Sequence, residues 1–218
     1  PAFVRALLSD ASLARIAATL NAVQPRPPRD PGAGSTTQIS TADEHGWVVS
    51  MTSSNGESCG WMLPGTGMLL NNFLGEEDLQ GPVGTVRAAG ERIRTMMTPT
   101  ILEEADGTVA ALGSGGANRI RSAVMQGIVH LVDRGCPPAE AVDHARIHHE
   151  DGSCRVELPG IAPGLDDHLE RHLGAVTRYP DLHMYFGGLH VVRLHPDGSF
   201  DGAGDPRRSG VYRCTSGT

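Results

Sequence analysis

The chain has little of several features that mark particular classes of protein. Aromatic residues make up only 4% of its 218 residues, so its core must be largely aliphatic. No apolar run approaches the roughly 20 residues needed to cross a bilayer. The formal net charge is −7 and there is no basic run, which argues against nucleic acid as a partner. These absences leave a globular chain, long enough for one good core, with no membrane span in this segment.

Cysteine is missing from the arrangement that zinc sites and redox dithiols use. The four cysteines form no CxxC pair and are widely spaced: Cys59, Cys136, Cys154 and Cys214. Zinc and redox centres are therefore not expected. Two disulfides and four buried thiols are both open, and thiols are favoured because nothing in the chain signals export. Because the chain starts at Pro1, we expect further residues upstream, and the compartment stays open.

Glycine, in contrast, is abundant, and the block from Gly113 to Asn118 reads GSGGAN. A dinucleotide-binding fingerprint is one interpretation, but the spacing is imperfect and no acidic residue follows a βαβ unit, so we expect no cofactor. A strand-to-helix turn is a second interpretation. A third adds chemistry to that turn, because N–H groups just before a helix N-terminus suit the oxyanion of a tetrahedral intermediate.

The most informative feature lies where a proline-rich linker, 24–35, gives way to an alternating β pattern that begins at Thr36. If the Ser35–Thr36 bond were cut, Thr36 would carry a hydroxyl and a free α-amine, so nucleophile and general base would arrive together. An α-amine has a reference pKa of roughly 7.7–8.0 and is substantially neutral near physiological pH. The simpler alternative is that the β-branched Thr36 and Thr37 merely open a strand.

The rest of the pattern alternates hairpins with helices. The expected ranges are 37–53 and 99–112 for two hairpins, 118–134, 138–145 and 165–173 for helices, and 188–194 and 199–202 for two later strands. Hairpins interleaved with paired helices indicate α+β layers rather than a wound βαβ sheet.

Several blocks in a fixed order carry a resemblance to a known family. They read TTQIS, ADEHG, VVSMTSSN, GTGMLLNN, RTMMTPTI, GSGGANRI, ARIHHE and, near the end, GAGDPR. From about Phe3 to Gly210 the chain resembles the catalytic small subunit of the γ-glutamyltranspeptidase family, preceded by the end of the large portion. The resemblance implies a self-cutting N-terminal nucleophile hydrolase with a four-layer αββα sandwich, only part of which this chain holds. Residues 1–35 would end the large-subunit portion with the cleavage linker, and 36–218 would form the catalytic small-subunit-like domain.

The resemblance also implies roles for particular residues. Thr36 is the nucleophile, and Gly116 and Ala117 donate N–H groups to the oxyanion, although the family usually has glycine at both positions. Ser54 and Asn55, where the strand returns beside Thr36, orient the α-amine and the substrate. The family has a Thr and an Asn two residues apart there, so ordinary turn residues are the alternative interpretation.

Substrate recognition departs further from the family. Glu76, with Glu77 as a rival, aligns with the acid that holds the α-ammonium of a glutamyl donor. Thr95 and Met96 stand where the family commonly has two serines that bind the α-carboxylate, together with an upstream arginine. Thr95 can donate a hydrogen bond, but Met96 cannot. One such bond to a charged group is worth about 1.5–3 kcal/mol, so the nucleophile is better supported than the substrate.

The histidines offer one metal pattern, because His144 and His148 are four residues apart and are followed by His149 and Glu150. In the resembling family this run is structural, so we expect no metal.

These observations predict an amide-cleaving enzyme that acts through a Thr36 acyl-enzyme, which water or an amine acceptor releases. The expected partners are the upstream large-subunit portion of the same precursor and a small-molecule γ-glutamyl donor such as glutathione. Two alternatives stay open. One is an acylase or amidohydrolase on the same scaffold with a non-glutamyl substrate, and the other is a non-catalytic, unprocessed subunit.

Overall fold

The computed structural model describes residues 36–76, 79 and 87–215, together with four helical, exposed residues near the N-terminus: Ala11, Ala14, Arg15 and Ala18. Contacts within the chain group it into two units, Pro1–Ala33 and Gly34–Thr218. The proline-rich linker, Ser35 and Glu77 lie outside the described residues. The predicted boundary between residues 35 and 36 stays a prediction.

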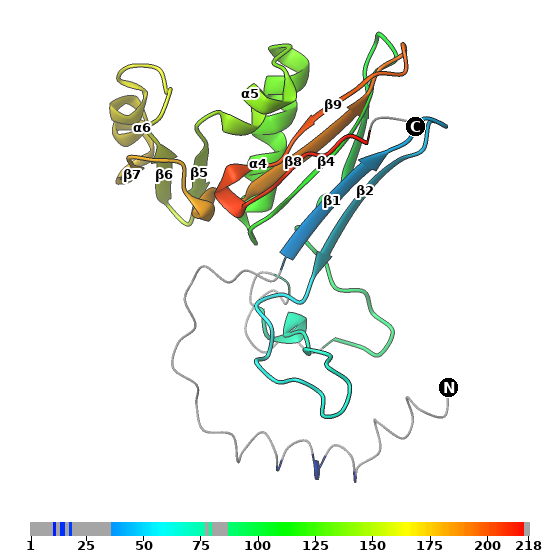
Figure 1. The fold of residues 1–218 in the computed structure, drawn as a ribbon. Helices are drawn as coiled ribbons and strands as arrows, with labels where there is room; N and C mark the ends of the chain where they lie inside the picture. Colours follow the sequence, from blue (N-terminus) through cyan, green and yellow to red (C-terminus); the bar gives the residue numbers. More distant parts are fainter. Residues whose placement is uncertain are drawn as a thin grey trace. The chain divides into compact units, whose positions relative to one another are not determined.

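A four-stranded antiparallel sheet forms the centre of the second unit (Figure 1). Its strand order is β3 (Thr100–Glu103), β4 (Val109–Gly115), β8 (Gly188–Leu194) and β9 (Phe200–Ala203). β4 is buried along almost its entire length, on both faces. Both faces of this sheet are therefore covered by other elements.

The hairpin of β1 (Thr36–Ala42) and β2 (Val48–Ser54) covers one face. Its inward side is polar, since Ser50 Oγ donates to the Leu112 carbonyl at 2.8 Å and the Gln38 side chain lies against Gly113. Its outward side is apolar and exposed, with Ile39 45%, Val49 49% and Met51 47% accessible. This alternation reverses the usual apolar-in, polar-out pattern of a half-buried sheet.

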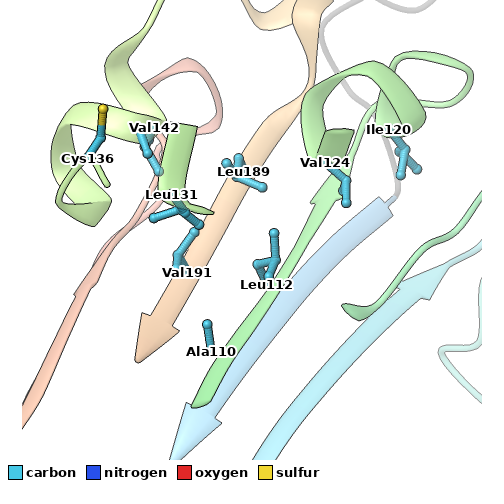
Figure 2. Packing of buried hydrophobic residues seen from close by; sticks show 10 residues of the cluster. Ala110, Leu112, Ile120, Val124, Leu131, Cys136, Val142, Leu189 and Val191 are labelled. Atoms are coloured by element: carbon cyan, nitrogen blue, oxygen red, sulfur yellow. The ribbon is translucent and has the colours of Figure 1, made fainter. Parts of the chain in front are cut away.

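Helices cover the other face of the sheet. α4 (Arg119–Ile128) continues into a π-helical turn, η2 (Val129–Asp133), and α5 (Pro138–Asp143) follows. Figure 2 shows the resulting aliphatic core between these helices and the sheet, formed by Ala110, Leu112, Ile120, Val124, Leu131, Cys136, Val142, Leu189 and Val191. The described residues thus supply three successive layers: helices, sheet and hairpin.

A smaller three-stranded sheet was not predicted. β5 (Ile147–Glu150) pairs antiparallel with β6 (Ser153–Glu157), and β6 pairs parallel with β7 (Val176–Tyr179). α6 (Leu165–Leu173) connects the two parallel strands, so one βαβ crossover exists beside the antiparallel layers. One crossover of this kind is compatible with the predicted α+β layers, and its strands were not predicted because four and five residues give too short a pattern to read.

The other predicted elements are confirmed with small shifts. Both hairpins form as expected, and α6 has the predicted bounds. The helix predicted over 118–134 changes to π-helical geometry at Val129, and α5 ends at Asp143 rather than Ala145. Three short 3₁₀ turns complete the assignment: η1 (Phe73–Gly75), η3 (Met184–Phe186) and η4 (Pro206–Arg208). No helix among the described residues is long and apolar enough to cross a bilayer.

Candidate functional site

Thr36 and Ser54 face each other at the open end of the hairpin. They are register partners, and their hydroxyl oxygens lie 2.8 Å apart. Ser54 Oγ also accepts the N–H of Gly56 at 3.0 Å. Because a hydroxyl both donates and accepts, Ser54 can keep this bond while it donates to Thr36 Oγ1. The predicted nucleophile therefore has a hydroxyl partner that can stabilise negative charge on its oxygen.

The end of β4 passes directly against the Thr36 backbone. A Cβ added to Gly115 would lie 2.8 Å from the Thr36 carbonyl oxygen, closer than side chains are found. Gly116 has φ +138°, and a Cβ there would lie 2.9 Å from the Cα of Gly187. Glycine is therefore required at both positions, and the glycine-rich block is packed between Thr36 and the start of β8.

Gly116 and Ala117 form the turn that opens α4. Their carbonyls accept the N–H groups of Arg119 and Ile120 at 3.1 and 3.0 Å. Ala117 adopts the left-handed conformation with φ +50°, which costs a residue with a Cβ about 1–2 kcal/mol. The departure from glycine thus carries strain at the predicted oxyanion site, while the oxyanion role of both residues stays a prediction.

Glu76 reaches the loop that follows β2. Its Oε1 accepts the N–H of Glu57 at 2.9 Å, and Asn72 Oδ1 accepts the same N–H at 2.8 Å. The Glu76 carboxylate also leaves no room for a side chain at Gly56, which has φ +64°. The structure therefore brings Glu76 beside Asn55 and Gly56, close in sequence to the Thr36–Ser54 pair.

Thr95 and Met96 are placed differently. Thr95 Oγ1 accepts the N–H of Met97 at 3.1 Å in a local turn, and the half-buried Met96 packs against the hydrophobic core. Within the described part of the chain, no hydrogen bond joins either residue to Thr36 or Ser54. Their role in substrate binding stays a prediction.

A buried ionic network behind the glycine block was missed by the sequence interpretation. Arg207 binds Glu157 through two contacts of 2.8 and 2.6 Å, and Arg146 binds Asp205 at 2.6 Å. Burial lowers the pKa of Arg146, and the Asp205 carboxylate opposes that shift. Arg146 also donates to the carbonyl of Gly187 at 3.3 Å. The network therefore holds the backbone against which Gly116 packs.

The sequence segments ARIHHE and GAGDPR contain three residues of this network, Arg146, Asp205 and Arg207. In the sequence, only these two segments could have pointed to it.

The histidine run lies in the same region of the structure. His148 is buried, with Ser122 Oγ 2.7 Å from its Nδ1 and Glu150 Oε2 3.3 Å from its Nε2. These are the partners of a structural histidine. His144 precedes β5, so the four-residue spacing does not lie on a helix.

All four cysteines are free thiols, two of them exposed and two buried. This agrees with the preference for thiols over disulfides, but the burial expected of all four holds only for Cys136 and Cys154.

Comparisons with known proteins agree with this geometry. The sequence profile of the gamma-glutamyltranspeptidase family matches residues 1–214. The chain is 32% identical over 184 residues to the acylase ACY 1 proenzyme of Pseudomonas sp. (strain SE83), covering 84% of this chain and 32% of that protein. It is 31% identical over 195 residues to the glutathione hydrolase proenzyme of Bacillus subtilis (strain 168), covering 88% and 32%. The chain thus spans about a third of the length of these curated relatives.

Solved structures share the fold. An acivicin-inhibited gamma-glutamyltranspeptidase superposes with a TM-score of 0.68 at 26% identity, over 79% of this chain and 99% of that chain. The Bacillus anthracis transpeptidase CapD superposes with a TM-score of 0.66 at 25% identity, over 82% and 99%. The predicted α+β fold of N-terminal nucleophile hydrolases is therefore confirmed.

Proposed function

Because this chain belongs to the gamma-glutamyltranspeptidase family, we propose that it carries the catalytic part of an enzyme that cleaves γ-glutamyl amide bonds of glutathione-type donors. Glutathione hydrolases and acylases are both among its relatives. The proposal names Thr36 as the nucleophile and the Ser35–Thr36 bond as the site of autocatalytic maturation.

The observation that carries the proposal is the position of Thr36. It opens β1, its hydroxyl lies 2.8 Å from Ser54 Oγ, and glycine-only backbone at Gly115 packs against its carbonyl. A threonine that merely opened a strand would need none of these features. Their combination supports a reactive hydroxyl rather than a simple strand start.

Maturation and catalysis use the same oxygen. In maturation, Thr36 Oγ1 attacks the Ser35 carbonyl carbon, an ester forms as the C–N bond breaks, and the Oγ1 proton passes to the nitrogen, which becomes the free α-amine of Thr36. Water then hydrolyses the ester, which leaves a carboxylate on Ser35 and restores the Thr36 hydroxyl. In catalysis, the α-amine takes the proton from Oγ1 as Oγ1 attacks the donor's amide carbon. The N–H groups of Gly116 and Ala117 stabilise the oxyanion, and the leaving amine takes the proton. Water or an amine acceptor then attacks the Thr36 ester and releases the acyl group.

The upstream portion of the precursor is proposed as the partner that completes the site. The outward side of the β1–β2 hairpin exposes apolar residues from alternate positions of both strands. Such a face is stabilised when a further layer covers it. The αββα fold calls for helices on this side, so the large-subunit portion is the expected occupant.

An acylase with a non-glutamyl substrate is the second candidate. It is favoured by Met96, which replaces a carboxylate-binding hydroxyl with a half-buried apolar side chain, and by the similarity to an acylase proenzyme. The third possibility, an unprocessed and non-catalytic subunit, requires that the Ser35–Thr36 bond stay intact.

The test uses the full precursor with its upstream portion. Thr36→Ala should remain a single polypeptide, whereas wild type should yield a chain whose N-terminal residue is Thr36 by N-terminal sequencing and intact mass. Thr37→Ala is the matched control, because Thr37 is adjacent and exposed. Cleavage of Thr36→Ala at the same bond with normal yield would show that the autocatalytic mechanism is wrong. An intact wild-type precursor without turnover would favour the non-catalytic alternative.

A further inference from the structure

Three side chains meet in the helical layer, one from the π-helical turn after α4, one from the segment before α5 and one from the end of α5. His130, Cys136 and His144 each offer a metal-binding atom, and these atoms lie within 4.8 Å of one another. Cys136 is buried, and the two histidines are half-buried. This cluster lies in the helical layer and takes no part in the mechanism proposed for Thr36.

The local backbone builds the cluster. The π-helical turn η2 carries His130, and the N–H of Cys136 donates to the His130 carbonyl at 2.9 Å. α5 then ends with His144 as its C-cap, whose N–H bonds the Glu140 carbonyl at 3.1 Å. π-Helical turns are rare in proteins, and those that do occur often lie at functional sites. The η2 turn and the end of α5 are thus arranged so that the metal-binding atoms of their side chains lie close together.

The side chains are in states that suit a metal. The two imidazole rings stack with centroids 3.9 Å apart, and His130 Nδ1 is buried with no hydrogen-bond partner. A buried ring nitrogen without a partner is costly unless something binds it.

Glu140 supplies a fourth donor. Its Oε1 lies 3.6 Å from Cys136 Sγ and 3.6 Å from His144 Nε2. The Glu140 side chain is 58% exposed, so an ion can enter the cluster from its side. One thiolate, two imidazoles and a carboxylate are together a ligand set typical of zinc.

We propose that His130, Cys136, His144 and Glu140 form a tetrahedral zinc site that fastens the end of α4 to α5. Binding forms four zinc–ligand bonds, breaks the Cys136 S–H bond and releases its proton to solvent, while the zinc ion gives up its bound waters.

The required movement is small. Tetrahedral ligands at about 2.0–2.3 Å from zinc lie roughly 3.3–3.7 Å from one another. The ligand atoms of His130, Cys136 and His144 now lie within 4.8 Å of one another, so they must approach by about an ångström. The stacked rings must also turn so that both point a nitrogen at the ion. This turn is easy because χ2 of histidine has a broad energy profile. The cysteine-pair pattern of known zinc motifs gave no sign of this site, because only one of its ligands is a cysteine.

The experiment uses the untagged full precursor, stripped of metal with a chelator, reloaded with Zn²⁺ and freed of excess ion by gel filtration. We expect one tightly bound zinc per chain by elemental analysis and a higher melting temperature than the stripped protein. Cys136→Ser and His144→Ala should each weaken zinc binding at least 100-fold and lose the thermal shift.

Two control variants separate this site from incidental binding. His172→Ala disrupts the other stacked histidine pair, His168 with His172 on α6, and Cys59→Ser removes an exposed thiol. Both should keep the bound zinc. Loading with Co²⁺ should give thiolate-to-cobalt absorption in wild type and none in Cys136→Ser.

Several results would overturn the inference. Wild type that retains no zinc would do so, as would a Cys136→Ser protein that keeps both zinc and the cobalt band. Equal losses in His144→Ala and His172→Ala would point to nonspecific histidine binding. If Cys136→Ser fails to fold, His144→Ala decides alone, since the half-buried His144 ends α5 through its backbone N–H, which the substitution keeps.

Discussion

The two sheets that face each other in this molecule both turn apolar side chains away from their shared interface, but only the four-stranded sheet has these side chains covered by other described elements. The four-stranded sheet buries aliphatic residues against the helices (Figure 2), and a buried ionic network backs it. The β1–β2 hairpin holds polar side chains inward, where Thr52 Oγ1 donates to Gln38 Oε1 at 2.6 Å, and leaves apolar ones exposed. One sheet is therefore complete within this chain, while the other lacks a cover among the described residues.

This difference divides the candidate site into two parts. The glycine block belongs to the complete sheet and is held by fixed contacts, whereas Thr36 and Ser54 belong to the uncovered hairpin. A two-stranded hairpin is marginally stable unless other elements pack on it. We therefore expect substitutions in the first part to lower stability strongly, and those in the second to change processing and turnover with little loss of stability.

The largest expected effect concerns the missing cover. Purified residues 1–218 without the rest of the upstream portion should turn over γ-glutamyl donors at least about 100-fold more slowly than the processed full protein, because misplacing a catalytic group by about an ångström has that cost. Steady-state assays with a chromogenic γ-glutamyl amide would measure the difference. Robust turnover by the segment alone would show that the hairpin needs no partner.

Among the residues behind the four-stranded sheet, Arg207 is the one whose substitution we expect to lower stability most. Arg207→Ala leaves Glu157 buried without its arginine, leaves Asp205 with Arg146 alone, and should cost about 3–5 kcal/mol of unfolding free energy. Arg178→Ala removes three ion pairs at the surface of α6 and should cost at most about 1 kcal/mol. Urea denaturation of the two variants tests the contrast, and equal losses would mean that burial does not set the strength of this network.

The boundary between the two parts can be tested at neighbouring residues. Gly116→Ala forces a Cβ towards Gly187 at φ +138° and should destabilise the protein by about 1–3 kcal/mol. It should also lower kcat by about 10²–10³-fold if an oxyanion donor is displaced. Ala117→Gly relieves a left-handed alanine and should change stability by less than about 1 kcal/mol. Thermal unfolding and kcat measure both, and similar behaviour of the pair would contradict the close packing at Gly116.

On the uncovered side, Ser54→Ala removes the hydroxyl 2.8 Å from Thr36 Oγ1. A hydrogen bond to a charged oxygen is worth about 1.5–3 kcal/mol, so kcat should fall about 10- to 100-fold with little loss of stability. Ser53→Ala is the control, since Ser53 points to the opposite, exposed side of the same strand. Unchanged kcat in Ser54→Ala would remove this residue from the catalytic machinery.

The smallest expected effect distinguishes the two substrates. If the donor is a γ-glutamyl compound, Met96→Ser restores a hydroxyl beside Thr95 and should improve kcat/KM by up to about tenfold, mainly through KM. If the enzyme is an acylase, the same change should weaken hydrolysis of donors that lack an α-carboxylate. Because Met96 packs on the core, its melting temperature must be measured as well. A loss on apolar donors with no gain on glutamyl donors would favour the acylase.

The sequence predicted local secondary structure well and contacts between residues far apart in the chain poorly. Alternation and turn residues placed the β1–β2 hairpin, and the helical pattern placed α6, because both signals lie within about ten residues. Alternation divides a strand into two faces but does not say which face is inward, so the polar interior beside Gln38 was not foreseen.

The ionic network was missed for a different reason. Arg146 and Asp205 are 59 residues apart and meet only when β8 brings their segments together. Spacing rules detect ligands on one element and have no access to such contacts. The pair Thr36 and Ser54, in contrast, was foreseen because one hairpin register brings them together.

The pairing of Thr36 with Ser54 has a consequence for the cut chain. Thr36 belongs to the terminal residue pair of the β1–β2 hairpin, and terminal pairs open and close with almost no cost in free energy. After the proposed cleavage, the new amine would lie on a strand end that frays. The rate of reaction would then be proportional to the fraction of time that this amine spends beside Thr36 Oγ1 in its reactive position. Whatever stiffens this strand end, whether a covering layer or a bound acyl donor, would therefore act as an accelerator without touching the reacting atoms.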